Sequence, residues 1–291
     1  YHETESFIAD YHRFKYCCIG NSGWDLNYGL MSSLPGENTV VIWDELAHNS
    51  IIMGGKAGRQ SERDTLSFRH NDMNHLSSLL AALPTNSSQE RLVVVEAVYS
   101  MDGDIAPLRD LLAVAERENA LVLVDEAHSL GLYGPRGEGL ITSMGLADHP
   151  ALLGVVYPFG KALGQHGAAF TTQHATLLPT LLNYSKPLVY STSLPVHSLL
   201  SIAHTYKKLS LLQKKRDYLF QLIDIFRSHC FRLNIPVLPS ASPIQGVLVP
   251  SNDAVMRVAK SLQSHGFSCF PIRAPTVPEG FERIRVILHS H

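Results

Sequence analysis

The sequence predicts an α/β protein with a mostly parallel sheet, followed by a smaller α+β domain. Short apolar runs rich in β-branched residues alternate with longer segments of helical periodicity. Residues 92–95 and 121–124 are apolar at every position, which is typical of strands covered by helices on both faces. At about residue 198 this alternation gives way to a long helical stretch that is charged on one side.

Five strands are expected in the first two thirds of the chain, and polar or glycine-rich segments bound each of them. They cover residues 39–42, 91–98, 121–124, 152–156 and 168–171. Helices with apolar residues at three- and four-residue spacing are expected at 72–82 and 107–119. Since βα alternation brings the carboxyl ends of parallel strands to one edge of the sheet, ligands are expected to bind at that edge.

The last third of the chain predicts a second domain. Residues 198–233 are expected to form one long connecting helix. A strand at 247–249, a helix at 253–265 and strands at 268–272 and 283–288 follow. We therefore expect a large domain over residues 1–200, and a connecting helix with a small α+β domain over residues 201–291.

Composition narrows the class of function. The chain has 45% hydrophobic and 17% charged residues, which is ordinary for an enzyme, and its net charge is −2. This balance favours small-molecule substrates over nucleic acid or an anionic membrane. No apolar run approaches the roughly 18 residues of a membrane span. The four cysteines lack CxxC spacing, so no metal site is expected, and an intracellular compartment is favoured, the cytoplasm before an organelle.

Lys161 is a candidate covalent residue. It follows the apolar run 152–159 and lies between two glycines. A deprotonated lysine amine can form a Schiff base with an aldehyde cofactor. Taken alone, the segment is more typical of a solvated loop lysine, so the interpretation depends on what the other strand ends carry.

Other strand ends carry polar side chains. Asp125 and His128 follow the strand at 121–124, Ser100 follows the strand at 91–98, and His48 follows the strand at 39–42. The acidic pair at 125–126 also resembles a helicase motif, but no G-x-x-x-x-G-K-[ST] phosphate loop precedes it. Each residue alone could be a cap or a turn residue. Their common position favours a site.

A helix start at residues 21–24 adds a possible phosphate site. Gly23 and Trp24 would present backbone N–H groups there, where the helix dipole favours an anion.

Taken together, six ordered segments resemble the α-oxoamine synthases, which are pyridoxal-phosphate (PLP) enzymes of the aspartate aminotransferase fold. The segments are residues 23–27, 44–50, 69–72, 99–104, 124–128 and 159–162. Residues 190–195 and 272–285 are similar to the biotin-pathway branch of the family. The resemblance runs nearly end to end. It implies a three-layer αβα large domain of PLP-transferase fold type I with a small C-terminal α+β domain.

The resemblance assigns the catalytic roles. Lys161 would bind PLP covalently and then act as the acid/base group. Asp125 would face the pyridine nitrogen and keep it protonated, so that the ring can accept electrons. His48 would stack on the ring, and His128 with Ser100 would lie near its phenolic oxygen.

The resemblance also assigns residues that bind phosphate and substrate. Gly23 and Trp24 would hold the phosphate. Thr192, with residues 190 and 191, would reach the cofactor of the partner in a homodimer. Arg285, with Arg273 nearby, would bind a substrate carboxylate through paired hydrogen bonds.

The implied reaction is the decarboxylative condensation of L-alanine with an acyl-CoA, pimeloyl-CoA if the biotin-pathway analogy holds. Two alternatives stay open: an α-oxoamine synthase that uses glycine or serine or takes a polyketide thioester, and a catalytically impaired paralogue that serves as a partner subunit. Pro158 stands where relatives usually carry Thr or Ser, and it offers neither a hydroxyl nor an N–H to a phosphate. Relatives also carry a segment before the position of Tyr1. We therefore expect this chain to bind PLP but to condense its substrates poorly.

Overall fold

The computed structural model describes residues 1–58, 65–84 and 89–290. Contacts divide the chain into two compact units. The first comprises Tyr1–Ala97 and Ala106–Leu211, and the second comprises Val98–Ile105 and Leu212–His291. The second unit thus includes a loop, Val98–Ile105, that the sequence places in the large domain.

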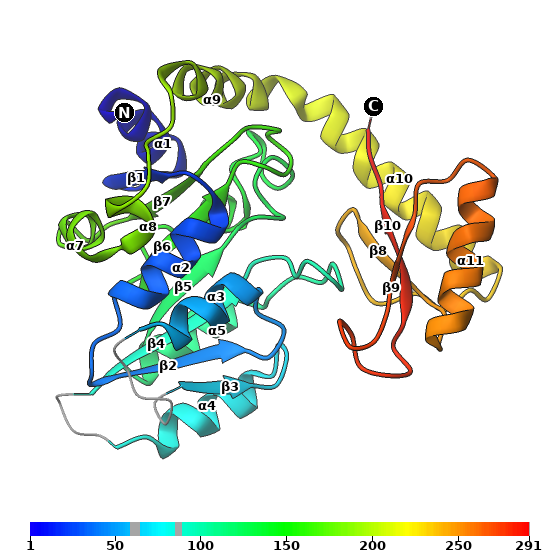
Figure 1. The fold of residues 1–291 in the computed structure, drawn as a ribbon, viewed down its shortest axis with the longest axis horizontal. Coiled ribbons are helices and arrows are strands. Elements are labelled where there is room, and N and C mark those ends of the chain that lie inside the picture. Colours follow the sequence, from blue (N-terminus) through cyan, green and yellow to red (C-terminus); the bar gives the residue numbers. More distant parts are fainter. Residues whose placement is uncertain (59–64, 85–88, 291) are drawn as a thin grey trace. The chain divides into compact units, whose positions relative to one another are not determined.

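A seven-stranded sheet forms the centre of the first unit (Figure 1). The five neighbouring strands β6, β5, β4, β2 and β3 are parallel, while β7 is antiparallel to both β6 and β1. This confirms the mostly parallel sheet. In spatial order the strands are β1 (Tyr16–Gly20), β7 (Ala168–Thr172), β6 (Leu152–Pro158), β5 (Leu121–Asp125), β4 (Glu90–Glu96), β2 (Thr39–Asp44) and β3 (Thr65–Phe68).

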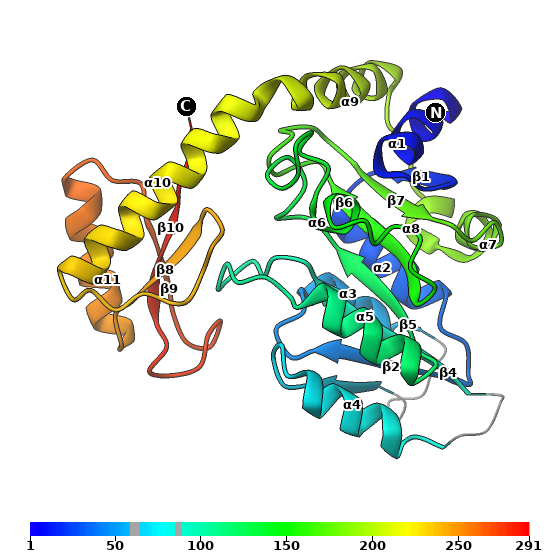
Figure 2. The same ribbon diagram turned by 180° about the vertical axis from the view of Figure 1, so that it is seen from behind.

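Helices cover both faces of this sheet. Helices α2 and α3 lie on the face that Figure 1 presents, and α4 and α5 lie on the face seen in Figure 2. The expected three-layer αβα architecture is therefore present. The helices are α1 (His2–His12), α2 (Gly23–Ser33), α3 (Asn49–Lys56), α4 (Met73–Ala82), α5 (Leu108–Arg117), α6 (Leu140–Ser143), α7 (Leu177–Tyr184), α8 (Lys186–Val189) and α9 (Val196–Leu209).

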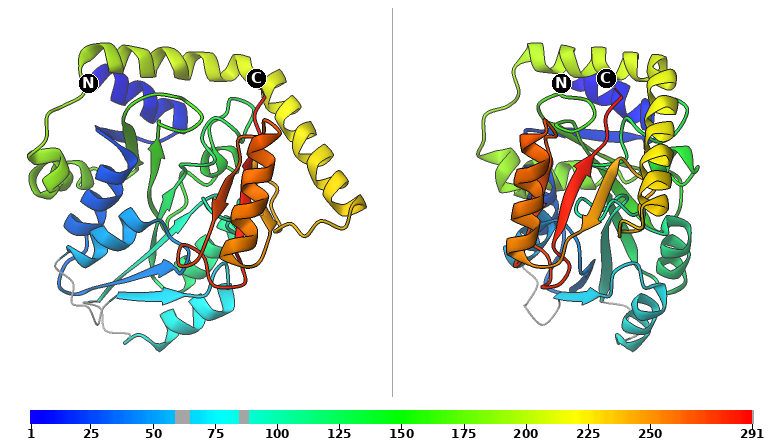
Figure 3. Two further views of the ribbon diagram at one scale, coloured as in Figure 1. Left: turned by 45° about the vertical axis from the view of Figure 1, so that its right-hand side comes forward. Right: turned by 90° about the vertical axis from the view of Figure 1, so that its right-hand side faces the viewer.

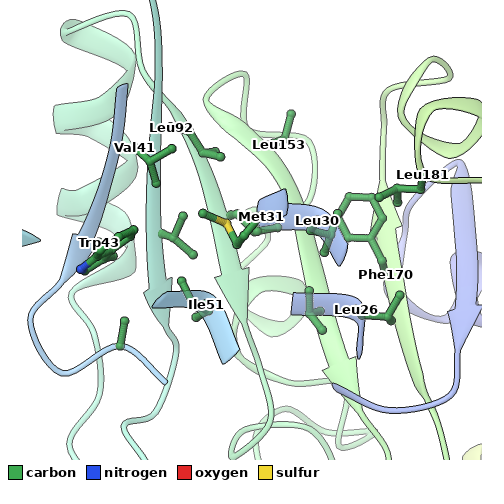
Figure 4. Packing of buried hydrophobic residues seen from close by; sticks show 14 of the residues in the cluster. Leu26, Leu30, Met31, Val41, Trp43, Ile51, Leu92, Leu153, Phe170 and Leu181 are labelled. Carbon is green, nitrogen blue, oxygen red and sulfur yellow. The ribbon is translucent and has the colours of Figure 1, made fainter. Parts of the chain in front are cut away.

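The core between α2 and the sheet fixes the position of α2. Leu26, Leu30 and Met31 of α2 are almost fully buried and pack against alternate residues of several strands (Figure 4). These strand residues include Val41 and Phe170. Because side chains alternate between the two faces of a strand, the remaining apolar strand residues face the opposite layer, which includes α4, α5 and α1, whose His12 stacks on Tyr157 of β6. The runs that are apolar at every position arise from this two-sided burial.

The second unit contains a three-stranded antiparallel sheet in the order β8-β10-β9. Helix α11 packs on this sheet (Figure 3). Its Val255 and Ala259 belong to one buried cluster with Ile284 of β10. The elements are α10 (Gln213–Arg232), β8 (Ile244–Leu248), α11 (Asn252–Ser264), β9 (Phe270–Ile272) and β10 (Arg283–Ile287).

The expectation of one continuous helix over 198–233 is wrong. Helix α9 ends at Leu209, a 3₁₀ turn spans Ser210–Leu212, and α10 then begins. The Ser210 hydroxyl bonds the carbonyl of Lys207 at 3.5 Å, a local bond that competes with regular helix geometry. Among the described residues, no helix is long and apolar enough to cross a membrane.

Candidate active site

Asp125 lies at the carboxyl edge of the sheet, as the last residue of β5. Its side chain is buried and accepts two hydrogen bonds from neutral donors. Asn27 Nδ2 of α2 donates to Oδ2 at 2.6 Å, and the backbone N–H of Ala127 donates to Oδ1 at 2.8 Å. The carboxylate is thus fixed in orientation before any ligand arrives.

Burial raises the pKa of Asp125 above its ordinary value. The hydrogen bonds from Asn27 and Ala127 oppose this shift, and so do the electrostatic interactions of Asp125 with His48 and Lys161. The structure therefore brings His48 and Lys161 within electrostatic range of Asp125. A buried carboxylate without a directly bonded cation is costly, so a cationic partner would relieve this site.

His48 begins α3 and is connected to Asp125 by hydrogen bonds. Its Nδ1 lies 2.7 Å from Ser50 Oγ, and Ser50 Oγ accepts from Asn27 Nδ2 at 3.2 Å. The second Asn27 Nδ2 hydrogen goes to Asp125. Ser50 and Asn27 are both buried, whereas the His48 ring is exposed. One continuous chain thus runs from an exposed imidazole to a buried carboxylate.

Helix α2 begins at Gly23, as the sequence predicted. Ser22 caps it by accepting from the Asp25 N–H at 3.0 Å, and the N–H groups of Gly23 and Trp24 belong to the first turn, which has no intrahelical acceptors. Pro158 packs against this turn so closely that a Cβ on Gly23 would lie 2.6 Å from its Cγ. Only glycine fits here.

Lys161 lies in a tight loop after β6. The loop is closed by bonds from Gly164 N–H to the Lys161 carbonyl and from Gln165 N–H to the Phe159 carbonyl, both at 3.0 Å. Lys161 itself is exposed, so its amine is accessible. His128, three residues after Asp125, is half-buried.

Thr192 is exposed and lies close to the start of α2. Asn21 Nδ2 donates to the Thr192 carbonyl at 2.7 Å and to Ser191 Oγ at 3.1 Å. The segment that was expected to reach a partner's cofactor is therefore held beside the N-cap of α2 in its own chain. Its role toward a partner stays a prediction.

Ser100, Arg273 and Arg285 belong to the second unit, and their roles toward the cofactor stay predictions. Arg285 is half-buried, its Nε has no hydrogen-bond partner among the described residues, and burial lowers its pKa. An arginine with an unused buried donor suits a carboxylate ligand. Arg273 is exposed.

Arg283 lies two residues before Arg285 on β10, and its side chain already has a hydrogen-bond partner within the second unit. It is buried, and its Nη1 donates to Asp102 Oδ1 at 2.5 Å in the loop that carries Ser100. The Ser240 hydroxyl also donates to the carbonyl of Gly103 in this loop, at 2.8 Å. These bonds hold the loop and leave Arg285 as the candidate for substrate.

The residues of the first unit fit PLP. Asp125 is a buried carboxylate with no directly bonded cation among the residues that the structure describes, as a protonated pyridine nitrogen requires. The first turn of α2 offers backbone N–H groups to a phosphate, and Lys161 offers an accessible amine. Pro158 contributes no donor beside that turn, as expected.

A cavity of about 790 Å³ elsewhere in the first unit is a poor candidate for this chemistry. Its lining includes Thr39, Glu90 and Leu121, which are the first or second residues of their strands. It therefore lies at the opposite edge of the sheet from Asp125. We expect the site at the carboxyl edge, where Asp125 interacts electrostatically with His48 and Lys161.

Sequence reasoning missed Asn27 and Ser50. Both lie inside the segments that carry the family resemblance, but no role was assigned to them. The available signal was Asn27 itself, a polar residue on the otherwise apolar, core-facing stripe of a helix.

Comparisons with known proteins identify the family. Residues 3–291 match the family of aminotransferases of class I and II. The chain therefore belongs to this family, and within it to the PLP-dependent α-oxoamine synthases, which are acyltransferases.

Particular relatives refine this class. The chain is 36% identical over 296 residues to 8-amino-7-oxononanoate synthase of Saccharophagus degradans, covering 100% of this chain and 71% of that one. It is also 36% identical to the enzyme of that name from Nitrosococcus oceani, covering 99% and 74%.

Solved structures are similar over the whole chain. A serine palmitoyltransferase from S. paucimobilis with a bound PLP–myriocin adduct has a TM-score of 0.90 and 29% identity, covering 100% of this chain and 71% of that one. The 8-amino-7-oxononanoate synthase of Francisella tularensis has a TM-score of 0.84 and 25% identity, covering 100% and 81%.

Proposed function

We propose that the chain acts as an 8-amino-7-oxononanoate synthase in biotin biosynthesis, condensing L-alanine with pimeloyl-CoA. The reaction would form the new carbon–carbon bond at Cα of alanine, and release carbon dioxide and free CoA. The observation that carries the proposal is the gathering of Asp125, His48 and Lys161 at one sheet edge. Relatives with 36% identity over nearly the whole chain bear this name.

Each residue has a role that its surroundings support. PLP, when bound, supplies the electron sink that stabilises a carbanion at Cα. Asp125 holds a proton on the pyridine nitrogen through its negative charge, and Lys161 removes and returns the proton at Cα. His48 covers one face of the ring and excludes water from it. Gly23 and Trp24 bind the phosphate through their N–H groups.

Arg285 is proposed to bind the substrate carboxylate. Its unused Nε and half-buried position support this role, whereas Asp102 already engages Arg283. His128 and Ser100 are proposed to lie at the ring edge, and Arg273 to assist Arg285.

A homodimer is proposed as the active form. Several large apolar side chains between the end of α7 and the start of α9 are exposed, among them Tyr184 at 60% and Tyr190 at 83%. A second copy that covered them would bring Thr192 close to the partner's site. Sedimentation of the purified chain measures this, and a monomer with full activity would contradict it.

A second reaction has its own support. Solved serine palmitoyltransferases with TM-scores of 0.90–0.92 are 29% identical to this chain. The alternative is therefore condensation of L-serine with a long-chain acyl-CoA, on the same site residues.

One experiment separates these reactions. The purified chain, loaded with PLP, is titrated with L-alanine, glycine and L-serine while its absorbance spectrum is followed, and CoA release is then measured with pimeloyl-CoA and palmitoyl-CoA. We expect a near-visible band that borohydride abolishes in the wild type and that is missing in Lys161→Ala. L-alanine with pimeloyl-CoA should give the fastest release. A preference for L-serine with palmitoyl-CoA would replace the first proposal by the second.

A further inference from the structure

We infer that Asn27 and Ser50 are positioning residues that couple Asp125 to His48. Asn27 favours the ionised form of Asp125, and Ser50 fixes the tautomer and the ring orientation of His48. The inference rests on the cofactor site proposed above. Its basis is the unbroken chain of hydrogen bonds from Asp125 Oδ2 through Asn27 Nδ2 and Ser50 Oγ to His48 Nδ1, at 2.6, 3.2 and 2.7 Å.

The donors and acceptors in this chain can point in one direction only. Ionised Asp125 can only accept, so the Asn27 amide must present its NH₂ group to it. The second hydrogen of that group goes to Ser50 Oγ, which leaves the Ser50 hydroxyl hydrogen for His48 Nδ1. The Ser50 backbone N–H also donates to Nδ1, at 3.3 Å. Nδ1 is therefore an acceptor, and neutral His48 carries its proton on Nε2.

The packing of α2 on α3 makes this chain possible. Gly54 lies one turn after Ser50 on α3, and a Cβ at Gly54 would lie 2.8 Å from the Cα of Tyr28 and from the Cβ of Met31. The glycine thus permits the close helix approach that brings Ser50 to Asn27. Asn27 Oδ1 has no hydrogen-bond partner among the described residues, so the amide is held by its NH₂ group alone.

The charges around Asp125 indicate what Asn27 does. His48, Lys161 and Glu126 interact with the carboxylate electrostatically. In the described part of the chain, Asn27 and the Ala127 N–H are the groups that stabilise its ionised form by hydrogen bonding. Asn27 thus keeps Asp125 ionised and able to hold the pyridine nitrogen protonated. Ser50 acts one bond further away and orients the His48 ring.

The test is PLP affinity as a function of pH. Asn27→Leu keeps a similar side-chain volume and removes the donor. We expect it to weaken PLP binding about 10- to 100-fold, the range for a lost hydrogen bond to a charged group. Because the pKa of Asp125 should rise without this bond, the acid limb of the affinity profile should move to higher pH. A purely structural Asn27 would lower the melting temperature of the PLP-free protein and leave that limb unmoved, which would overturn the inference.

Ser50→Ala is a second variant, which tests the inference even if Asn27→Leu does not fold. We expect about 3- to 10-fold weaker PLP binding, as for a neutral hydrogen bond. In a His48→Gln background, Ser50→Ala should have no further effect, since Ser50 acts through His48. Equal effects of Ser50→Ala in both backgrounds would contradict this.

Ser33→Ala is the matched control. This serine lies on α2 and its hydroxyl donates to the Gly29 carbonyl of the same helix at 2.6 Å, so PLP affinity should stay unchanged. PLP affinity does not depend on the substrates. A wild-type chain that binds PLP but releases no CoA would contradict the proposed reaction, while the affinities of the variants would still decide this inference.

Discussion

Asp125 and Glu126 are neighbours in the chain, both are buried, and burial raises the pKa of both, that of Glu126 to about 7. Their surroundings differ. Glu126 accepts from the N–H groups of Leu140 and Ile141, at 2.7 and 2.6 Å, and from the Ser129 hydroxyl. All three donors belong to the loop and the short helix that Glu126 organises. Asp125 accepts from two donors, the Asn27 amide and the Ala127 N–H, and interacts electrostatically with His48 and Lys161.

This difference separates a structural carboxylate from a functional one. Gly139 has a φ of 87°, and a Cβ there would lie 2.1 Å from Glu126 Oε2, so the loop is closed tightly around Glu126. No loop in the described part of the chain closes around Asp125 in this way, and its carboxylate still requires a cationic partner. Burial and a raised pKa are common to both residues, so the donor set is what distinguishes them.

Asp125→Asn should have the largest effect, and the effect should be on activity. Asparagine cannot hold a proton on the pyridine nitrogen by charge, so we expect kcat/KM for CoA release to fall about 10²- to 10³-fold, equivalent to about 3–4 kcal/mol. The free energy of urea unfolding should fall less than in Glu126→Gln, because the Asn27 amide can turn its unpartnered Oδ1 toward the new NH₂ group. Unchanged kcat/KM would place Asp125 with Glu126 as a structural residue.

Glu126→Gln should have the opposite effect, because it should reduce stability rather than activity. One carboxylate oxygen becomes an NH₂ group that faces a backbone N–H, so the free energy of unfolding should fall by about 1–3 kcal/mol at neutral pH. PLP affinity should change little. A variant that lost PLP but kept its stability would show that Glu126 has a functional rather than a structural role.

The pH dependence of stability sharpens the role of Glu126. Its folded-state pKa, about 7, is raised from 4.5, so the folded state retains a proton that the unfolded state releases. The stabilisation by this group is present below pH 4.5 and is lost as the pH rises to about 7. Glu126→Gln should flatten this slope, which chemical unfolding at several pH values measures.

His12→Phe should have the smallest effect on activity, and its effect on stability has two parts. The buried Tyr206 hydroxyl loses its bond to His12, which should cost about 1–3 kcal/mol at every pH, and the pH dependence of stability should change in acid. His12 is buried against Tyr157, its Nε2 lies 3.1 Å from the Tyr206 hydroxyl, and burial lowers its pKa from 6.5 to about 3. Here the unfolded state binds the extra proton, so stability is lost as the pH falls from 6.5 toward 3, by at most about 1.4 kcal/mol per pH unit. In the variant, the free energy of unfolding should decrease less as the pH falls through this range, which chemical unfolding at several pH values measures. An unchanged decrease would show that other groups cause the acid sensitivity.

The family and the strand ends could be predicted from the sequence because they depend on local pattern. Asp125 could be placed because it directly follows a run of four apolar residues, and Lys161 because it follows another apolar strand. The strand β1 was missed, since its five residues include two cysteines and a glycine and it pairs only with the antiparallel strand β7. Pairing with a distant strand leaves no periodic signal in a short segment.

The sequence by itself determined the α/β class, the parallel sheet edge, and the residue types that PLP chemistry needs there. Only the tertiary structure decided how those residues are supported. Asn27 reaches Asp125, and Ser50 reaches His48, because two helices approach closely at Gly54. Such contacts join positions far apart in the chain, and their geometry depends on helix packing, which no local pattern encodes.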